Sequence, residues 1–524
     1  MSTSKKDLVL FDTTLRDGAQ MEGLTLTADD KLRIAQKIDE LGVQYIEVFA
    51  GSNPKDDEFF RRAGSELRLK HAKLVAFSST RRAGTTPGKD EGLRALVGTD
   101  VPVACIVGKS SDLHVKEALR TTLDENVNMV SSTIRYLKRH FDEVFFDAEH
   151  FFDGYKRNGQ YALRVLEAAA EAGADCLVLC DTNGGCLPHE IRRIVSEVGE
   201  AVGANLGIHC HNDADCAVAN SLAGIEAGAV HVQGAMNGYG ERCGNANTAS
   251  LAANLVLKLG IPVITNSQLA RLSEVAHYVY EVSNVTPNPQ QPYVGSSAFA
   301  HKAGLHASAI ARRRDLYEHI DPGLVGNVRH LVVSELGGKA TVVLKAQELG
   351  IEVGEERTLS GVIRRVKELE HLGYHFEAAD GSFELLLRRA TGWEQEFFTI
   401  ESFRVIVETN GGGAISSEAT VKLHANGQRY ISTAEGNGPV NALDAALRKA
   451  LFTTYPELEK IHLADYKVRI LNENVGTAAT TRVLIESADG EKEWGTIGVS
   501  ENIIEASWEA LVDGYVYGLL HQPR

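Results

Sequence analysis

A short stretch near the start of the chain combines acidic, basic and amide side chains in a spacing that could do chemistry. Residues 12–20 read Asp-Thr-Thr-Leu-Arg-Asp-Gly-Ala-Gln and follow directly after the apolar run Leu8–Phe11. Charged groups at the end of a buried strand cost several kcal/mol unless they pair or bind a metal. A helix cap would explain an Asp-Gly pair alone, but it requires neither Arg16 nor Gln20. We therefore predict that this stretch lies at the rim of a sheet and takes part in a reaction.

Two histidines farther along the chain indicate metal chemistry. His209 and His211 are two residues apart in an apolar run, so their side chains project from the same face of a strand. A single strand histidine is usually a satisfied core residue, but a pair beside an acid from another strand favours a metal. With the carboxylate of Asp17 and the amide oxygen of Asn245, they would form a mixed site for Mg, Mn or Zn that leaves positions open for a substrate oxygen.

These residues need a scaffold that brings several strand ends together. From Leu8 to about Gly260 the sequence repeats an apolar, β-branched run, a polar loop and a segment with helical periodicity. The eight apolar runs are Leu8–Phe11, Tyr45–Phe49, Leu74–Phe77, Val101–Val107, Val144–Phe146, Cys176–Cys180, Leu206–His211 and Val230–Met236. The helical segments include Asp29–Leu41, Asp112–Arg139, Gly159–Ala172, Pro188–Val202, Asp215–Ala227 and Asn247–Leu259. This alternation predicts an α/β fold, a (β/α)8 TIM barrel.

Active sites of this fold lie on the loops that follow the strands. Unusual polar residues are found at the ends of five of the eight predicted strands. They are Arg16 and Asp17; Asp147, Glu149 and His150; Asp181 and Thr182; His209, His211, Asn212 and Asp213; and Asn237, Glu241, Arg242 and Asn245. We expect these side chains to converge on one rim of the barrel.

Length and composition limit the remaining function classes. A chain of 524 residues is long enough for about three domains. Its net charge of −16 argues against a nucleic-acid partner, because the best basic cluster is only Arg312–Arg314. It has no signal-peptide pattern and no apolar run of about 18 residues, so we expect a cytoplasmic protein with no membrane contact. Seven cysteines without a Cys-x-x-Cys pair indicate reduced, mostly structural thiols.

The composition changes twice after the predicted barrel. A proline-rich linker begins near Asn284, and helical material including Leu359–Leu372 continues through Arg389. This middle region is too interrupted for a core of its own and should pack on a neighbour. We predict a catalytic barrel in residues 1–275, linker subdomains in 276–395 and a regulatory, amino-acid-binding domain in 396–524.

The last region contains a weak internal repeat. Its predicted strands are Phe403–Glu408, Ala419–Leu423, Lys467–Leu471 and Thr481–Glu486. The helix near Asn441 matches the helix near Asn502 at a constant offset, with similar residues at corresponding positions. This predicts an α+β domain built from two pseudo-symmetric repeats.

Three motifs together resemble a known family. Residues 12–20, His-Cys-His-Asn-Asp at 209–213 and Gly-Glu-Arg-Cys-Gly-Asn-Ala-Asn at 240–247 are similar to the signatures of a metallo-TIM-barrel family. That family contains the 2-isopropylmalate, homocitrate and citramalate synthases and the hydroxymethylglutaryl-CoA lyases. The resemblance covers nearly the whole chain, because the synthases also carry a linking region and a regulatory domain of two repeats. It is greatest to the long citramalate synthases, including residues 77–82 and 213–225.

The resemblance implies an acyltransferase that condenses acetyl-CoA with pyruvate to (R)-citramalate and CoA, the first step of a threonine-independent isoleucine route. It also implies a homodimer, a divalent metal ion and feedback inhibition by isoleucine. The implied metal ligands are Asp17, His209, His211 and Asn245. Arg16 would stabilise charge on the keto oxygen, Thr182 would bind the keto-acid carboxylate, and Glu149, His306 and Tyr317 would be further catalytic groups.

Several alternatives remain open at this point. The base that deprotonates acetyl-CoA is Glu149 or His306, because the synthases often carry an acid where this chain has Ser308. A synthase for a larger 2-keto acid would use the same catalytic set, and leucine would then replace isoleucine as the inhibitor. A lyase lacks a region like 397–524. An amino-acid sensor on an inactive barrel is disfavoured because every expected ligand is present.

We place the effector carboxylate near Gly436, Gly438 and Pro439, which precede a predicted helix.

Overall fold

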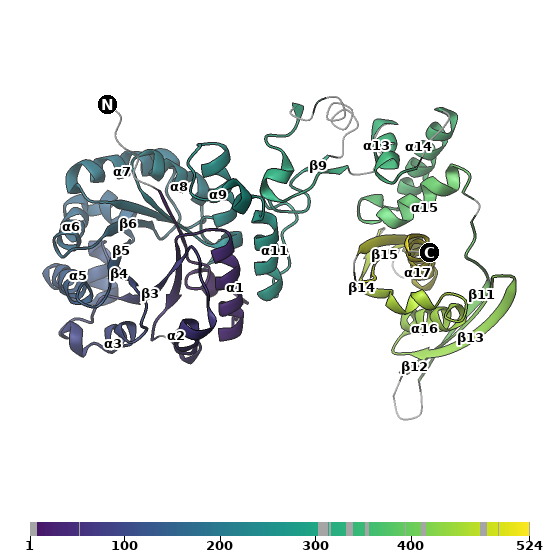
Figure 1. The fold of residues 1–524 in the computed structure, drawn as a ribbon, viewed down its shortest axis with the longest axis horizontal. Helices are drawn as coiled ribbons and strands as arrows, with labels where there is room; N and C mark the ends of the chain where they lie inside the picture. Colours follow the sequence, from purple (N-terminus) through teal and green to yellow (C-terminus); the bar gives the residue numbers. More distant parts are fainter. Residues whose placement is uncertain are drawn as a thin grey trace. The chain divides into compact units, whose positions relative to one another are not determined.

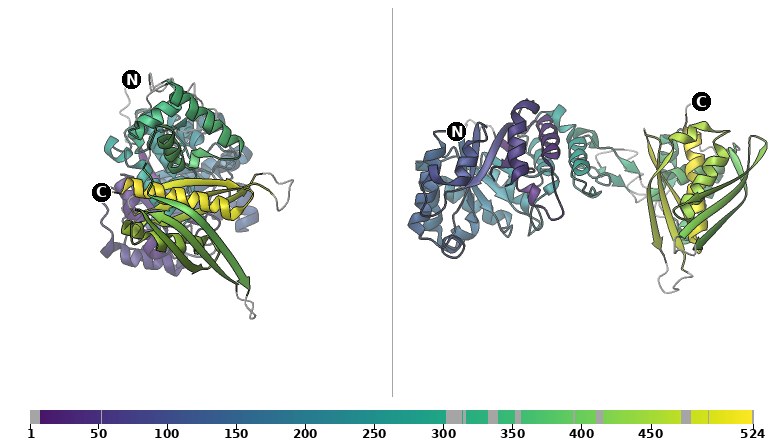
Figure 2. Two further views of the ribbon diagram at one scale, coloured as in Figure 1. Left: turned by 90° about the vertical axis from the view of Figure 1, so that its right-hand side faces the viewer. Right: turned by 90° about the horizontal axis from the view of Figure 1, so that it is seen from below.

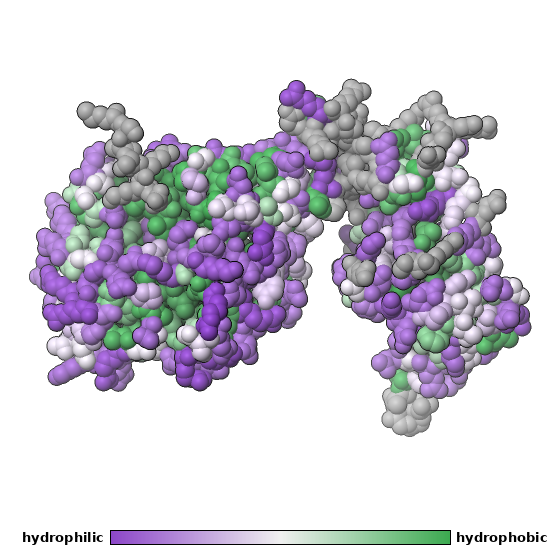
Figure 3. All heavy atoms as spheres, in the orientation of Figure 1, coloured by the Kyte–Doolittle hydropathy of each residue, from purple (hydrophilic) through white to green (hydrophobic). Residues whose placement is uncertain are grey.

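The computed structural model describes residues 8–51, 53–301, 313, 316–331, 339–351, 356–393, 395–409, 415–471, 479–490 and 492–522. Contacts divide these residues into two units. The first extends to Phe299 and includes Ile320–Arg329, and the second contains Ala300–His319 and the chain from His330 onward. No helix within these ranges has both the length and the hydrophobicity that a membrane span requires. In the view of Figure 3, hydrophilic side chains cover much of the first unit, with hydrophobic residues gathered between them.

The first unit is a closed barrel of eight parallel strands that pair in chain order, with helices around them (Figure 1). The strands are β1 Val9–Asp12, β2 Tyr45–Phe49, β3 Lys73–Ser79, β4 Val103–Lys109, β5 Glu143–Glu149, β6 Cys176–Asp181, β7 Leu206–Cys210 and β8 His231–Gly234. The barrel closes where Val9 of β1 pairs with His231 of β8 and Asp12 pairs with Gly234. The predicted TIM barrel is confirmed, and each predicted apolar run overlaps one strand.

The helices around the barrel bury an apolar stripe toward the strands. They are α1 Ala28–Glu40, α2 Pro54–Glu66, α3 Glu91–Val97, α4 Asp112–His114, α5 Leu123–Leu137, α6 Phe151–Glu171, α7 Pro188–Val202, α8 Ala217–Glu226, α9 Thr248–Leu257, α10 Asn266–Leu269 and α11 Leu272–Val282, with short turns η1 Gly18–Gln20, η2 Pro87–Lys89, η3 Val115–Leu119 and η4 Met236–Gly238. In α7, the buried residues Ile191, Ile194, Val195 and Val198 share one face. Pro188 starts this helix, and Gly203, with φ 63°, ends it.

Two predicted helices had wrong bounds. The predicted helix Asp112–Arg139 is interrupted, because the π-helical turn η3 ends at Arg120, whose φ of 52° is left-handed. Helix α5 begins only at Leu123, after the Thr122 hydroxyl accepts a hydrogen bond from the Glu125 amide at 3.1 Å. The helix predicted to start at Gly159 starts at Phe151, with Asn158 outside the helical region.

An apolar cluster fills the interior of the barrel. It consists of Phe11, Tyr45, Val75, Phe77, Val103, Cys105, Phe145, Cys176, Val178 and Cys180. The Tyr45 and Phe145 rings meet edge to face, with centroids 5.2 Å apart, and the Phe11 and Tyr45 rings stack at 5.7 Å. The barrel is therefore a packed core and not a pore, as is usual for this fold.

The second unit contains two copies of a three-strand and one-helix arrangement. The first copy is β11 Phe398–Thr409, β12 Ile415–Ala425, β13 Gln428–Gly436 and α16 Pro439–Leu451, and the second is β14 His462–Ile470, β15 Thr481–Ala488, β16 Glu493–Ser500 and α17 Ile503–His521. Figure 2 shows both helices against the sheets. The α+β domain is confirmed, but the prediction missed the third strand of each copy, β13 and β16.

Helices of the middle region pack on the second of these copies. They are α13 Lys339–Glu348, α14 Glu356–His371 and α15 Asp380–Ala390. The shorter elements of the chain after the barrel are β9 Ala300–His301, η6 Pro322–Val325, β10 His330–Leu331, η7 Phe376–Ala378 and η8 Pro456–Lys460. Phe383 of α15 shares a buried cluster with Ile497 of β16. Ser382 accepts a hydrogen bond from the Ile497 amide at 3.1 Å and donates one to Asp513 at 2.9 Å. Helix α15 is therefore part of the core of this unit.

The proline-rich segment after the barrel packs on the first unit. Tyr293 is buried and donates a hydrogen bond to Asn254 of α9 at 2.9 Å. Tyr280 of α11 donates one to the buried Gln291 at 2.5 Å. The segment thus lies along the barrel helices, although its three prolines suggested only a linker.

Asp39→Ala is expected to destabilise the first unit by about 3 kcal/mol, because it would leave several backbone amides of the loop before β3 without a hydrogen-bond acceptor. Asp39 of α1 is 1% exposed and accepts hydrogen bonds from the backbone amides of Lys70, His71 and Ala72, each at 2.8 Å. Thermal unfolding measures the effect. The control is Asp29→Ala on the same helix, because the Asp29 side chain is 70% exposed and forms only a surface ion pair with Arg62. A similar fall in Tm in the two variants would contradict the expectation.

Candidate metal and active site

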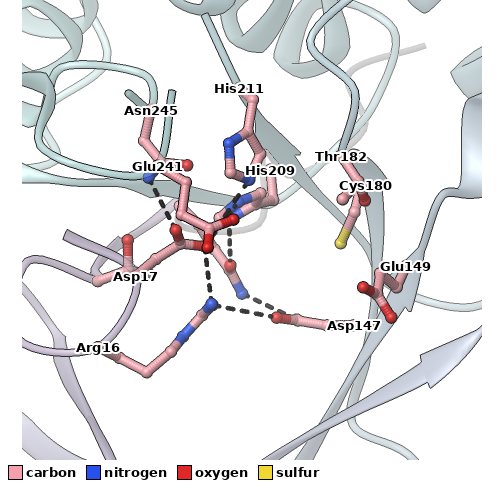
Figure 4. Close-up of polar contacts among 12 residues, drawn as sticks. Arg16, Asp17, Asp147, Glu149, Cys180, Thr182, His209, His211, Glu241 and Asn245 are labelled. Atoms are coloured by element: carbon pink, nitrogen blue, oxygen red, sulfur yellow. Dashed lines mark hydrogen bonds and ion pairs between the residues drawn. The ribbon is translucent and has the colours of Figure 1, made fainter. Parts of the chain in front are cut away.

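Four predicted ligands lie side by side at the carboxyl ends of the strands (Figure 4). Asp17 follows β1, His209 lies on β7, His211 directly follows β7, and Asn245 lies in the loop after β8. Asp17 Oδ2 is 3.5 Å from His209 Nε2 and 3.8 Å from His211 Nε2. Asn245 Nδ2 donates a hydrogen bond to Asp17 Oδ1 at 3.2 Å. All four side chains are buried, and Asp17, His209 and His211 could hold one metal ion.

The loop after β8 needs its glycines to bring Asn245 into this cluster. His211 and Asn245 form an isolated antiparallel bridge. Gly240 has φ 149°, and a Cβ atom there would be 2.2 Å from Asn245 Nδ2. Gly244 has φ 85°, and its Cβ atom would be 1.9 Å from the Gly238 carbonyl oxygen. The Gly-Glu-Arg-Cys-Gly-Asn motif is therefore explained by close backbone approach to a ligand side chain.

The protonation of this cluster suits a metal. Burial lowers the pKa of His209 to about 3, and burial also lowers the pKa of His211. Burial opposes ionisation of Asp17, but the charge of Arg16 beside it holds the pKa of that carboxyl well below its usual range. Two neutral imidazoles and a carboxylate are typical ligands of divalent transition metals.

Next to this cluster, the guanidinium of Arg16 contacts three buried carboxylates. Arg16 Nη1 is 2.7 Å from Asp17, its Nε donates to Glu47 of β2, and its Nη2 is 3.7 Å from Asp147 of β5. Its guanidinium also lies over the Phe77 ring, 4.0 Å from the centroid. Three carboxylates and one arginine leave an excess of negative charge that a divalent cation would balance. Burial raises the pKa of Glu47 and that of Asp147, and the charge of Arg16 opposes this rise.

The orphaned oxygen of Asn245 also fits a cation. Asn245 Oδ1 is buried and has no hydrogen-bond partner among the residues that the structure describes. A buried amide oxygen without a partner is costly, and a hard cation would satisfy it. Both this oxygen and the charge balance around Arg16 agree with a divalent ion held by Asp17, His209, His211 and Asn245.

Glu149 and Thr182 lie on the same rim, at the ends of β5 and β6. Glu149 forms an ion pair with Lys109 at the end of β4. The Thr182 hydroxyl accepts a hydrogen bond from the His150 amide at 2.8 Å, and its carbonyl accepts one from Arg242 at 2.7 Å. Arg242 also makes a bidentate pair with Asp213 at 2.7 and 2.9 Å, so the loops after β6, β7 and β8 are tied together.

A cavity of about 450 Å³ borders Glu149. Val107, Leu119 and Met129 give it apolar walls, and Arg82 and Lys109 contribute cationic side chains. Arg82 is exposed at this position. The cavity therefore combines room for an extended apolar group with positive charge for an anionic one.

For two predicted site residues, the place relative to this cluster stays a prediction. His306 lies outside the described residues, and Tyr317 is 43% exposed and belongs to the second unit. Glu47, Lys109 and Gln233 also belong to this site, although they were not predicted from the sequence. Glu47 interrupts the apolar run Tyr45–Phe49, and Gln233 interrupts Val230–Met236. A polar residue inside a strand that is otherwise apolar could have indicated these two as site residues.

Three protein-family models match the chain in succession. The HMGL-like family matches residues 7–279, which contain the whole barrel. The homocitrate synthase post-HMGL domain-like family matches residues 293–373. The LeuA allosteric (dimerisation) domain matches residues 377–519, from η7 into α17.

Curated relatives match the chain over almost its full length. An (R)-citramalate synthase of Streptomyces coelicolor is 56% identical, covering 98% of this chain and 96% of the relative. An (R)-citramalate synthase of Aquifex aeolicus is 52% identical, covering 98% and 97%. A 2-isopropylmalate synthase of Methanocaldococcus jannaschii is 32% identical, covering 96% and 93%. The two relatives with higher identity thus share one activity.

Proposed function

The chain belongs to the family of (R)-citramalate synthases, and we propose that it condenses acetyl-CoA with pyruvate to give (R)-citramalate and CoA. The observation that supports this most is identity above 50% with two such synthases along the entire chain. The buried cluster of Asp17, His209, His211 and Arg16 supplies the chemistry that such a condensation needs.

Arg16 and a divalent cation would share the charge that develops on the ketone. Carbon attack on pyruvate places negative charge on the keto oxygen, and a cation held by Asp17, His209, His211 and Asn245 would supply Lewis acidity there. Arg16 lies beside Asp17, and its contacts to three carboxylates fix its orientation before substrate arrives. Preorganised donors of this kind stabilise a transition state without having to reorient.

Thr182 and Glu149 complete the set of roles. We assign the Thr182 hydroxyl to the pyruvate carboxylate, because Arg242 and His150 hold that residue at the rim. Glu149 borders the cavity whose apolar and cationic lining suits a thioester arm, so it is the described carboxylate placed to take a proton from the acetyl methyl. The family resemblance keeps His306 as the alternative base and Tyr317 as a further catalytic group. Attack of the resulting carbanion forms the new C–C bond, and hydrolysis of the thioester then releases CoA.

Release of free CoA, measured with a thiol reagent, tests the reaction and the keto acid. We expect the highest kcat/KM with pyruvate and much lower values with 2-oxoisovalerate and 2-oxoglutarate. A preference for 2-oxoisovalerate would make the chain a 2-isopropylmalate synthase, which the 32% relative keeps as the second candidate. No CoA release with any keto acid would contradict a synthase.

The second unit indicates an oligomer, because it matches a LeuA allosteric (dimerisation) domain, and we propose that the chain is a homodimer. Mass photometry of the full chain at nanomolar concentration should then give a single species of twice the chain mass. A fully active monomer under those conditions would contradict the proposal.

We further propose isoleucine as a feedback inhibitor that acts at the second unit. Helix α16 begins after Gly438, which provides no side-chain cap, while the Asn437 amide donates to Asn441 Oδ1 at 3.0 Å. The remaining amides of that first turn could receive an amino-acid carboxylate. The full chain is required for the test, because cutting after α15 would expose its buried face against β16 and break its hydrogen bond to Asp513 of α17.

Gly438→Asp is expected to weaken isoleucine inhibition at least tenfold with kcat nearly unchanged, because the added carboxylate caps the helix and repels another one. Asn426→Asp adds the same charge in the turn between β12 and β13 and serves as the control. Unchanged inhibition by isoleucine in the Gly438 variant would move the effector away from α16. Inhibition by leucine alone would favour the isopropylmalate reaction.

A further inference from the structure

A buried glutamine of β8 links a histidine of the metal cluster to a carboxylate of the Arg16 cluster. Gln233 is 1% exposed and lies in the middle of β8. Its Oε1 is 2.8 Å from His209 Nδ1, and its Nε2 donates a hydrogen bond to Asp147 Oδ1 at 3.0 Å. Both ends of one amide are therefore used, each toward a residue from a different strand.

The two contacts together define which nitrogen of His209 carries the proton. A carboxylate only accepts, so the NH2 end of the Gln233 amide must face Asp147 and the carbonyl end must face His209. His209 then donates from Nδ1, and the lone pair of its Nε2 points to Asp17 Oδ2 at 3.5 Å. Two acceptor atoms that face each other in a buried site are stabilised by a cation that both can bind.

The same contacts close a ring of five buried side chains. The ring passes from Asp17 to Arg16 at 2.7 Å, on to Asp147 at 3.7 Å, and through Gln233 to His209, which faces Asp17 again. Each member is at most 6% exposed. Figure 4 shows Arg16, Asp17, Asp147 and His209 arranged around a common centre. Gln233 is the neutral member that can both donate and accept.

We propose that Gln233 is a positioning residue of this site, which holds His209 in the Nδ1–H form for a divalent cation and holds Asp147 toward Arg16. The inference rests on the proposed function only in taking the metal ligands assigned there. A glutamate at this position could accept from His209 but could not donate to Asp147. It would also add a fourth carboxylate around a single guanidinium. A leucine could do neither.

Calorimetric titration of the full-length, metal-stripped chain with Mn²⁺ tests the proposal. Gln233→Leu should weaken Mn²⁺ binding by about 10- to 100-fold, the usual cost of losing a partner that orients a ligand. Gln233→Glu keeps the acceptor for His209, so it should bind Mn²⁺ at least as tightly as the wild type. Its kcat should still fall about tenfold or more, because Asp147 loses its donor beside Arg16.

The control is Gln44→Leu at the opposite end of the barrel, where Gln44 precedes β2. Gln44 accepts from the Leu10 amide at 2.8 Å and donates to the carbonyl oxygens of Gly42 and Val263 at 2.8 and 3.1 Å. This variant should lower Tm without changing the Mn²⁺ affinity. Equal loss of affinity in both leucine variants would reduce Gln233 to a structural role.

A second readout uses the wild-type protein, so it does not depend on a variant that folds. Nitrogen-15 spectra of histidine-labelled, metal-free protein should show His209 as a single tautomer protonated on Nδ1, and an Nε2–H form would overturn the proposal. Wild-type binding with an unchanged Gln233→Leu affinity would also overturn it. Failure of the wild type to bind Mn²⁺ would instead contradict the metal site of the proposed function.

Discussion

Replacing His211 with alanine is expected to lower kcat by about a thousandfold or more and to remove tight Mn²⁺ binding while the chain stays folded. The imidazole is 5% exposed, and its Nε2 lies 3.8 Å from Asp17 Oδ2. A divalent cation that polarises a carbonyl contributes several kcal/mol to the transition state, and each 1.4 kcal/mol is about a factor of ten in rate. Losing one of four ligands should therefore remove most of that contribution.

A matched histidine controls for the loss of a buried ring. His231 of β8 is 2% exposed and packs between Phe11 and Phe145, with ring centroids 4.9 and 5.1 Å away. His231→Phe keeps an aromatic ring in this apolar layer and should leave Mn²⁺ affinity and kcat near the wild-type values. Steady-state kinetics and metal titration measure both variants. A fully active, metal-independent His211→Ala protein would show that the cluster is not the metal site.

The residues that could be predicted from the sequence are those whose signal is local. His209 and His211 could be paired because the strand period alone places residues two apart on one face. Asp17 could be placed at a rim because it lies in the polar stretch that follows a buried run. The eight apolar runs were sufficient for the barrel, since parallel strands buried on both faces read as continuous hydrophobic segments.

The residues that could not be predicted depend on register between distant strands. Glu47 of β2 and Asp147 of β5 contact the same guanidinium because, in the closed barrel, both side chains point to its interior. Gln233 reaches His209 through the pairing of β7 with β8, which no local pattern specifies. Strands β13 and β16 were missed for another reason. Their sequences, Gln428–Gly436 and Glu493–Ser500, mix polar residues and glycine, and they form strands because the neighbouring strand and helix cover one face.

Arg16→Lys is expected to lower kcat by about 10²- to 10³-fold with Mn²⁺ still bound. The substitution keeps the positive charge, but the Arg16 guanidinium directs its Nε toward Glu47, its Nη1 toward Asp17 and its Nη2 toward Asp147. A lysine ammonium is a single point charge on a flexible stem and cannot hold three carboxylates in one plane. The transition state would then lose a preorganised donor, for which losses of this size are typical.

The cost to folding can be separated from the cost to catalysis. Glu47 is fully buried, and its Oε1 has no partner in the described part of the chain, so weakening its contact to residue 16 should also lower Tm. Arg62 of α2 offers a matched control, because it too contacts three acids, Asp29, Glu58 and Glu66, but at the surface. Arg62→Lys should change neither Tm nor kcat appreciably, since exposed ion pairs contribute little.

The separate values of kcat and KM distinguish the two roles that Arg16 could have. If Arg16 stabilises only the transition state, kcat and kcat/KM for pyruvate should fall together, with KM nearly constant. If it only bound pyruvate in the ground state, KM would rise and kcat would stay near the wild-type value. A near-normal kcat in Arg16→Lys, with a lowered Tm, would mean that Arg16 is only a structural partner of Glu47. The divalent cation alone would then stabilise the charge on the keto oxygen.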